Sequence, residues 1–411
     1  MDVLFVHNNF PGQYRHIVRR LQQDGGARLF AIGAKASPGL PGVSVARYEL
    51  SAAAPAKDVH PFARRFEGEM RRAEAVARAA LQLREKAGAD PAVILVHPGW
   101  GENTPLRTIF PRARIISYCE FFYGTGADVG FDPEFSRPSP LDHVRLSAWN
   151  AATLLALNDS DAAVSPTEWQ RSRYPALYRP MIQAVHDGID TKAIRPGPAQ
   201  PWSFGGITIE PGEEVITYVA RNLEPYRGYH IFMRALPRIL SARPRARVVI
   251  VGGDGVSYGA KPPEGKTWRG IFFDEVRGDL DLSRVHFVGQ LPYDIYLALL
   301  RHSRAHVYLT YPFVLSWSAL EAMASGCLLV GSATPPVEEV ISHGDNGLLV
   351  PFFDQDALVE TVVEASAAPE RFLALRDSAR RTVVERFDLE SVCLPRQMAL
   401  LHGGAPLIPM D

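Results

Sequence analysis

The chain has 411 residues, of which 46% are hydrophobic and 22% are charged, and its formal net charge is −1. This length predicts two domains, and the near-neutral charge excludes a global field that would favour nucleic acid or an acidic partner. The cysteines are too few and too widely spaced for a disulfide framework or a zinc site, so buried free thiols in a reducing cytoplasm are expected. They are Cys119, Cys327 and Cys393.

The first predicted domain covers residues 1–190. It opens with the apolar run "DVLFV", which has strand length, followed by the loop "HNNFPGQ" and a helix with one apolar face. No basic region precedes this run, so a signal peptide is not expected. Further strands are predicted at "RLFAIG", "AVILVH", "RIISYC" and "AAVSP". Apolar strands that alternate with helices indicate a parallel sheet covered on both faces.

Residues 61–90 of this domain predict one long helix with arginines at seven-residue spacing on one face. That face could meet anionic lipid, so peripheral contact with the inner face of the membrane stays open. Acidic residues interleave with the arginines, however, which favours a mixed and solvated surface. The arginines are Arg64, Arg65, Arg71 and Arg72, and the acids are Glu67, Glu69 and Glu74. No stretch of the chain approaches the length of a membrane span, so a cytoplasmic protein is expected.

Residues 187–213 are rich in Pro and Gly and are interpreted as a linker. A second domain, residues 191–385, is then predicted from the strands "EVITYVA", "ARVVIVGG", "RVHFVGQ", "HVYLT", "LLVGS" and "GLLVPF", with helices between them. A helix within 386–411 is expected to join the first domain. The predicted fold is thus α/β, with two Rossmann-like doubly wound domains that face each other across a cleft. Ligands of such sheets bind at the carboxyl ends of the strands.

Two arginines flank the first loop of the second domain, "RNLEPYRG". Arg221 directly follows a strand, and Arg227 and Gly228 lie just before a helix. A helix N-terminus and two guanidiniums together predict a clamp for phosphate oxygens, although two solvated arginines remain the simpler alternative. In the first domain, Gly12 of "NNFPGQYRH" permits close approach of the backbone to a ligand, or marks an ordinary turn.

Glu321 is a lone acid in the apolar run "YPFVLSWSALEAMASGCLLVGS". Ser318 and Glu321 have the spacing of a capping box. Alternatively the helix begins at Ser316, so that the amides of Leu315, Ser316 and Trp317 point outward to a phosphate and Glu321 accepts hydrogen bonds from sugar hydroxyls. The residues alone leave both interpretations open.

Polar residues also follow two predicted strands of the first domain, in "VHPGWGEN" and "YCEFFYGTG". They are His97, Glu102, Glu120 and Tyr123. At strand ends these groups can face a ligand, although a single His or Glu in a loop is more often structural.

Several other patterns are weighed and set aside. Gly253, Gly255 and Gly259 are spaced G-x-G-x-x-x-G, which does not fit a dinucleotide-binding loop. The D-x-D pairs 159/161 and 279/281 resemble metal ligands for a diphosphate, but no third ligand is evident, so turn residues are favoured. The chain contains no nucleophile elbow, Walker A loop or H-E-x-x-H motif.

Together these motifs resemble one family, the retaining GT-B glycosyltransferases of family 4. The stretch "LEAMASGCLLVGSATPPVEEVISHGDNGLLVPFFDQDALVETV" is similar to the C-terminal signature of that family, and "VARNLEPYRGYHIF" to its diphosphate-binding loop. Arg221 stands at the family's Arg position and Arg227 at its Lys position. "VHDGIDTKAIRP" resembles the family's hinge, and "VHNNFPGQYRH", "HPGWGEN" and "FDPEF" resemble the N-terminal part of one branch.

The resemblance implies transfer of a sugar from a UDP- or GDP-sugar to an acceptor hydroxyl, with retention of configuration and without a metal or other cofactor. It implies a role in glycan, glycolipid or polysaccharide synthesis, with glycan, lipid-linked or small-molecule acceptors and no nucleic acid. The leaving diphosphate needs preorganised cations and amides. The implied donor residues are Gly12, Arg221, Arg227, Leu315, Ser316, Trp317 and Glu321, the implied acceptor residues Asn9, Gln13, His97, Glu102, Glu120 and Tyr123, and the implied catalytic residues Arg221, Arg227, Glu120 and His97.

One position departs from the family. The motif E-x7-E has its first Glu eight residues before Glu321, where this chain has Phe313. That acid usually contacts the hydroxyls of the donor sugar, so a different mode of sugar recognition is expected. A nucleotide-sugar epimerase and a non-catalytic nucleotide-sugar-binding protein therefore remain as alternative functions.

Overall fold

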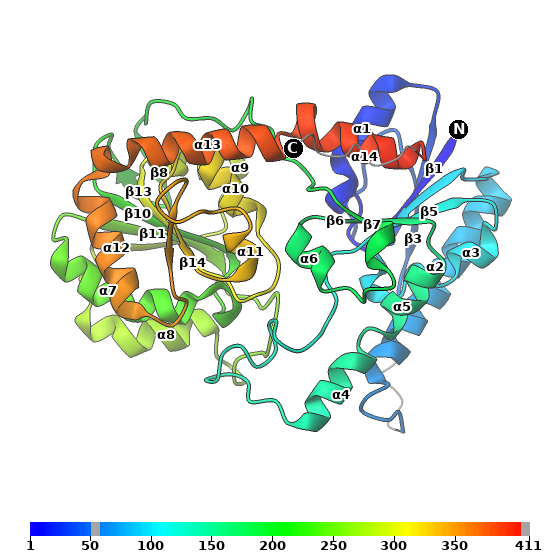
Figure 1. The fold of residues 1–411 in the computed structure, drawn as a ribbon, viewed down its shortest axis with the longest axis horizontal. Helices are drawn as coiled ribbons and strands as arrows, with labels where there is room; N and C mark the ends of the chain where they lie inside the picture. The colour runs from blue at the N-terminus through cyan, green and yellow to red at the C-terminus, as the bar shows by residue number, and fades with distance from the viewer. Residues whose placement is uncertain (51–57, 404–411) are drawn as a thin grey trace. The chain divides into compact units, whose positions relative to one another are not determined.

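The computed structural model describes residues 1–50 and 58–403. The chain forms two compact units. The first consists of Met1–Gly130, Arg137–Gly188 and Glu390–Asp411, and the second of Phe131–Ser136 and Ile189–Leu389 (Figure 1). Both units are therefore built from segments that are not contiguous in sequence.

The first unit contains a parallel sheet in the order β3-β2-β1-β4-β5-β6-β7. All the strands predicted for this domain are confirmed. The short strands β3 and β7 were not predicted, because neither carries a continuous apolar run. The bounds are β1 Asp2–Val6, β2 Arg28–Ala34, β3 Ser44–Tyr48, β4 Val93–Val96, β5 Arg114–Tyr118, β6 Ala162–Ser165 and β7 Ile182–Ala184.

Helices cover this sheet. Helices α2 and α3 pack over buried residues of β1 and β4, such as Leu4 and Ile94. The C-terminal helix α14 lies beside α1 (Figure 1). The bounds are α1 Arg15–Asp24, α2 Arg64–Ala87, α3 Leu106–Ile109, α4 Pro140–Ala148, α5 Ala151–Asn158, α6 Glu168–Ser172 and α14 Leu394–Leu401. All three cysteines are buried free thiols, as expected.

The arginines of α2 are paired with the acids that interleave with them. Arg65 contacts Glu69 at 2.8 Å, and Arg71 contacts Glu67 one turn away. Glu69 is buried and Arg65 packs against the rings of Tyr123 and Trp149, so the predicted solvated face is wrong at this pair, whereas the pair of Arg71 and Glu67 is only partly exposed. Within the described residues, no helix is long and apolar enough to cross a membrane.

The second unit contains a parallel sheet in the order β12-β11-β10-β13-β14-β15. Every predicted strand is confirmed. Helices α7, α8 and α12 pack on one apolar cluster of the sheet, and α9, α10 and α13 on another. The strands are β10 Val215–Asn222, β11 Arg247–Gly253, β12 Val285–Gly289, β13 Ser303–Tyr308, β14 Leu329–Ser332 and β15 Leu348–Val350. The helices are α7 Tyr229–Ala242, α8 Trp268–Val276, α9 Tyr293–Leu300, α10 Trp317–Ala324, α11 Pro335–Glu338, α12 Gln355–Ala367 and α13 Leu373–Phe387.

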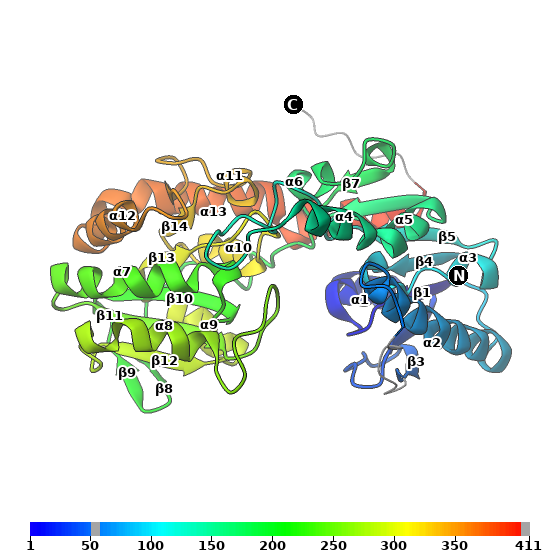
Figure 2. The ribbon, with the colours of Figure 1, turned by 90° about the horizontal axis from the view of Figure 1, so that it is seen from below.

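The predicted linker 187–213 is in part a hairpin of the second unit. Strands β8 (Trp202–Phe204) and β9 (Ile207–Ile209) pair antiparallel at the edge of that unit (Figure 2). Gly205 and Gly206 form the turn, with φ of 58° and 81°. Trp202 is buried against the sheet and donates from Nε1 to the carbonyl of Ile295 at 3.0 Å. The apolar residues that flank "GG" were the signal of this hairpin.

The segment Phe131–Ser136 belongs to the second unit, although the sequence analysis placed it in the first domain. Asp132 is buried there, accepts a hydrogen bond from the Tyr311 hydroxyl at 2.8 Å and lies 3.0 Å from Nε2 of His230. Glu134 forms a bidentate pair with Arg234 at 2.7 and 2.8 Å. No local pattern indicates this docking, because Tyr311, His230 and Arg234 are each more than 90 residues away in sequence.

Replacement of Asp132 by alanine is expected to destabilise the second unit. The buried Tyr311 hydroxyl and His230 ring would lose their partner, and a buried polar group without a partner costs about 1–3 kcal/mol. The matched control is Glu134→Ala, since Glu134 is exposed and its loss should cost no more than about 1 kcal/mol. Denaturant unfolding measures the free energy of unfolding of both variants. Equal losses of free energy would contradict the stabilising role of the buried Asp132.

Candidate functional site

The order of the strands locates a candidate site in each unit. In the second sheet the chain runs outward from β10 to β11 and β12, then returns to add β13 on the other side of β10. The loops after β10 and β13 therefore diverge at the carboxyl edge, which is where doubly wound sheets bind ligands. In the first sheet the same reversal lies between β1 and β4. We call these two places the switch points.

The two predicted clamp arginines have different environments at the second switch point. Arg227 is 8% exposed, and its Nη1 donates to Oγ1 of Thr310 at 3.0 Å and to the carbonyl of Val314 at 3.2 Å. It thus ties the loop after β10 to the loop after β13. Arg221 is exposed, and its side chain has no hydrogen bond or ion pair within the described part of the chain. Arg221 is therefore available to an anion.

A glycine-containing loop after β11 covers Arg227. Glu224, which is 1% exposed, accepts hydrogen bonds from the amides of Ser257 and Tyr258 at 3.0 and 3.1 Å. Burial raises the pKa of Glu224 despite these hydrogen bonds. The ring of Tyr258 lies 5.4 Å from Cζ of Arg227. Sequence reasoning missed Glu224 and Tyr258, because only the fold brings them to the arginine.

Phe313 lies in the aromatic group beside this arginine. Its ring centroid is 4.6 Å from that of Tyr258 and 5.9 Å from that of Tyr226. Phe313 itself is buried. The position where the family motif has an acid is therefore part of an apolar wall.

The structure decides between the two interpretations of Glu321. Helix α10 begins at Trp317 with Ser316 as its N-cap, so the predicted capping box of Ser318 and Glu321 is wrong. The Ser316 amide donates to the hydroxyl of Tyr308 at 2.7 Å, which fixes this earlier start.

Glu321 lies inside helix α10 and is 9% exposed. It accepts a hydrogen bond from the Tyr293 hydroxyl at 2.7 Å, and burial raises its pKa. Near the start of the same helix, Leu315 is buried and Trp317 is 40% exposed.

The first switch point holds a buried histidine and a carboxylate. His97 follows β4, and its Nδ1 accepts from the amide of Gly99 at 3.2 Å. Its Nε2 lies 3.0 Å from Oε2 of Glu120, which is half-buried. The indole of Trp100 stacks on the His97 ring at 4.1 Å. His97 and Glu120 are thus brought together as the sequence analysis expected of adjacent strand ends.

The other predicted acceptor residues are placed differently. Glu102 is fully buried, accepts from the Tyr48 hydroxyl at 2.5 Å, and has its pKa raised by burial. Tyr123 packs against Arg65 and Trp149. Neither side chain has a hydrogen bond to His97 or Glu120 in the described residues.

The loop after β1 holds the other three predicted residues. Asn9 is exposed and Gln13 is half-buried. Gly12 has a φ of 47°, and a Cβ there would lie 2.8 Å from Cε1 of His7. The group that lies close to the Gly12 backbone, where a ligand was expected, is therefore the His7 ring.

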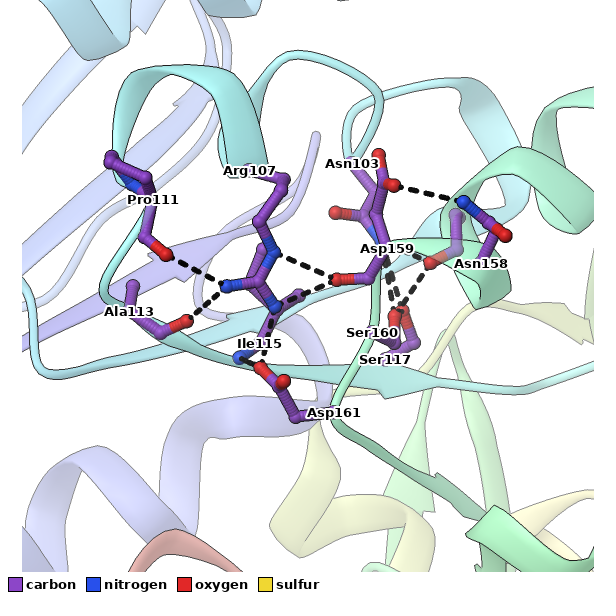
Figure 3. A network of polar contacts seen from close by, with 11 residues as sticks. Asn103, Arg107, Pro111, Ala113, Ile115, Ser117, Asn158, Asp159, Ser160 and Asp161 are labelled. Atoms are coloured by element: carbon purple, nitrogen blue, oxygen red, sulfur yellow. Dashed lines mark hydrogen bonds and ion pairs between the residues drawn. The ribbon is translucent and has the colours of Figure 1, made fainter.

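The two D-x-D pairs serve as structural residues. Asp161 accepts from Nη2 of Arg107 at 2.6 Å and from the amide of Ile115 at 2.8 Å, while the carbonyl of Asp159 also binds Arg107 (Figure 3). Asp281 accepts from the amide of Ser283 at 3.1 Å in a turn. The preference for turn residues is thus supported by these contacts.

One group among the described residues has the spacing of metal ligands, namely Asp132, Glu134 and His230. Its carboxylates already have partners, since Arg234 binds both oxygens of Glu134 and the Tyr311 hydroxyl binds Asp132. The cation that neutralises the Glu134 carboxylate in the structure is therefore the guanidinium of Arg234.

Two protein-family models match this chain, one in its N-terminal part and one in its C-terminal part. The family model "Glycosyl transferase family 4 group" matches residues 25–194, and "Glycosyl transferases group 1" matches residues 204–382. The chain belongs to the family 4 group of GT-B glycosyltransferases. These two matches cover the sheets of both units except for β1, which precedes the first match.

Curated relatives of the family align with part of the chain. A glycogen synthase of Mycobacterium tuberculosis is 27% identical over 57% of this chain and 53% of that protein. A D-inositol 3-phosphate glycosyltransferase of Segniliparus rotundus is 27% identical over 61% and 55%. The chain thus spans about half the length of these relatives. A GDP-mannose-dependent alpha-(1-6)-phosphatidylinositol monomannoside mannosyltransferase of Mycobacterium tuberculosis is 25% identical over 70% and 71%.

Solved structures of GT-B glycosyltransferases share the whole fold. A sucrose-phosphate synthase from Thermosynechococcus elongatus has a TM-score of 0.68 at 18% identity, over 98% of each chain. HepE of Anabaena, in complex with UDP and glucose, also has a TM-score of 0.68, at 15% identity over 98% of this chain and 100% of that chain. At these identities the likeness shows the fold alone.

The raised pKa of Glu321 predicts how Glu321→Gln changes stability. Because the folded pKa is higher than the unfolded one, ionisation of this buried carboxyl costs stability as pH rises through and above the unfolded value, about 4.3. The glutamine avoids that cost and can still accept from Tyr293. The variant should therefore become more stable relative to the native chain as pH rises from about 4 to 7. Thermal melts across this range measure the effect, with the exposed Glu360→Gln as control. A loss of stability that is the same at every pH would contradict it.

Proposed function

We propose that this protein is a retaining glycosyltransferase that transfers a sugar from a UDP- or GDP-sugar to an acceptor hydroxyl. The observation that supports the proposal is the second switch point, where Arg227 donates to the carbonyl of Val314 just before α10 and where the exposed Arg221 lies at the end of β10. The relatives support the donor class, since one is described as GDP-mannose-dependent and HepE was solved with UDP.

The proposed donor site uses positive charge to stabilise the leaving diphosphate. Arg221 contacts the phosphates directly. Arg227 holds the loops after β10 and β13 together and adds its charge beneath them. The amides of the first turn of α10 supply further donors, apart from that of Ser316, which already donates to the Tyr308 hydroxyl. Such preorganised groups act where negative charge grows as the glycosidic bond breaks. Glu321 then accepts hydrogen bonds from the ribose.

The proposed mechanism needs no protein nucleophile. The acceptor hydroxyl attacks on the face from which the diphosphate leaves, and a phosphate oxygen takes its proton. His97 of the first unit holds the Glu120 carboxylate through its Nε2–H, and the remaining lone pairs of that carboxylate accept hydrogen bonds from sugar hydroxyls. The charge is stabilised by arginines and amides, so we propose that no metal takes part.

The cellular role is inferred more broadly. We propose a cytoplasmic enzyme of glycan, glycolipid or polysaccharide synthesis, which works at the membrane surface where the acceptor is lipid-linked. Two alternatives are a nucleotide-sugar epimerase and a non-catalytic nucleotide-sugar-binding protein. Phe313 and the Tyr258 ring over Arg227 favour the non-catalytic reading. Release of UDP or GDP that depends on an acceptor would exclude both.

Arg221→Ala is expected to weaken UDP and GDP binding with no loss of folding stability, because the side chain is exposed. Loss of a charge-assisted hydrogen bond costs about 1.5–3 kcal/mol, or roughly ten- to a hundredfold in affinity. Titration calorimetry measures this. Arg238→Ala, which removes an exposed arginine of α7 paired with Asp356, is the matched control. Unchanged affinity in Arg221→Ala would remove this residue from the donor site.

Transfer activity is expected to persist in excess EDTA, because arginine and amide groups replace the metal in the proposed mechanism. The anomeric proton of the product, followed by NMR from the first minutes, should show the configuration of the donor. An inverted product would disprove retention, and loss of activity in EDTA that Mg²⁺ or Mn²⁺ restores would disprove metal independence.

A further inference from the structure

His7 lies at the first switch point and has no role in the site described so far. It directly follows β1, as His97 directly follows β4, and these strands pair with Val6 opposite Val96. The two rings are therefore neighbours, with centroids 5.6 Å apart and planes at 83°. His7 is 5% exposed and also packs edge-on against Trp100.

The backbone fixes the tautomer of both rings in the same way. Nδ1 of His7 accepts from the amide of Asn9 at 2.9 Å, and Nδ1 of His97 accepts from the amide of Gly99 at 3.2 Å. A neutral ring that accepts at Nδ1 carries its proton on Nε2. Burial lowers the pKa of His7 to about 3, so its ring is neutral at pH 7.

The Nε2–H groups of the two rings differ in what they meet. That of His97 reaches Glu120 at 3.0 Å. That of His7 is buried, and no described residue meets it in hydrogen-bond geometry, although the Gln13 side chain approaches the ring. Native structures rarely leave a buried N–H without a partner. An unused donor at a switch point is a reason to expect a ligand oxygen there.

The surroundings indicate what kind of oxygen this is. Within the described residues, the contacts of the His7 and His97 side chains are to aromatic rings, backbone amides, Gln13 and Glu120, and none is to a lysine or arginine. A phosphate at this place would meet the Glu120 carboxylate without a balancing cation. An uncharged hydroxyl suits both groups, since it accepts from His7 and donates to Glu120.

We propose that His7 is a sugar-binding residue, whose Nε2–H donates to a hydroxyl oxygen of an uncharged sugar next to Trp100 and Glu120. The inference rests on the proposed glycosyltransferase function and narrows it, because the sugar is unphosphorylated where it meets this subsite. In this proposal the half-buried Gln13 side chain, which approaches the His7 ring, is displaced by the sugar hydroxyl.

Two substitutions of His7 distinguish the loss of its Nε2–H hydrogen-bond donor from a loss of folding stability. His7→Asn places an amide oxygen where Nδ1 was, so it keeps the bond to the Asn9 amide and loses the donor at Nε2. His7→Gln reaches the Nε2 position with an amide N–H. The probes are glucose, mannose, maltose and myo-inositol, with glucose 6-phosphate and inositol 1-phosphate as charged counterparts. Each is titrated by calorimetry with UDP or GDP present, and UDP-glucose is compared with UDP to test a sugar carried by the donor.

The expected result is that the native chain binds at least one uncharged sugar better than its phosphorylated counterpart. His7→Asn should weaken that binding by about three- to tenfold, His7→Gln should recover most of it, and affinity for UDP or GDP alone should not change. The same loss seen for UDP-glucose but not for UDP would assign the sugar to the donor. A loss seen only with free sugars would assign it to the acceptor.

Equal sugar affinity in the native chain and His7→Asn would overturn the proposal, as would preference for the phosphorylated sugar. If His7→Asn does not fold, His7→Gln decides, because it should bind sugar nearly as well as the native chain and a large loss would count against the inferred donor. Failure of the proposed function looks different. In that case the native chain would bind no UDP, GDP or nucleotide sugar, whatever residue stands at position 7.

Discussion

Reversal of the strand order is the constraint on which both candidate sites depend. All strands of the two large sheets run parallel, so their carboxyl ends share one edge, and only at the reversal do neighbouring loops turn to opposite faces. In the second unit this opening is bridged by Arg227, which binds Thr310 and the carbonyl of Val314. In the first unit it is lined by His7 and His97. The polar side chains that could bind a ligand therefore lie at the switch points, where the loops diverge.

Burial of charge is the second theme of the donor unit. Arg227, Glu224 and Glu321 are each less than 10% exposed. A buried charge is costly unless it is paired or hydrogen-bonded, and all three have such partners in the structure. Glu224 illustrates what this arrangement achieves, because its hydrogen bonds to two amides hold Tyr258 above Arg227. The position of the ring thus depends on a carboxylate that binds the backbone of the loop.

The sequence predicted most strands and the family, but fewer of the side-chain relations. Long apolar runs such as "VITYV" predict buried parallel strands, and every strand predicted in this way is present in the structure. Short strands such as Ile182–Ala184 lack enough residues to show a pattern. His97 and Glu120 were placed together because adjacent strand ends meet. His7 was not predicted as a site residue, because the reason to single it out is a buried Nε2–H without a hydrogen-bond partner among the described residues. The three-dimensional structure is needed to see this. The start of α10 was ambiguous because two serines compete for the N-cap, and the Tyr308 hydroxyl that decides between them is eight residues away.

The route of the chain has a consequence for how the protein folds and how it can be divided. The second unit includes Phe131–Ser136, which precedes the rest of it by more than 50 residues, and the first unit includes α14, which follows the second unit in the chain. A fragment that begins at Ile189 would contain the whole second sheet but would leave His230 and Arg234 without the acids they meet in the intact chain. A fragment that ends before Glu390 would lack the helix that lies along α1. A cut between residues 188 and 189 therefore leaves each unit without a segment that belongs to it.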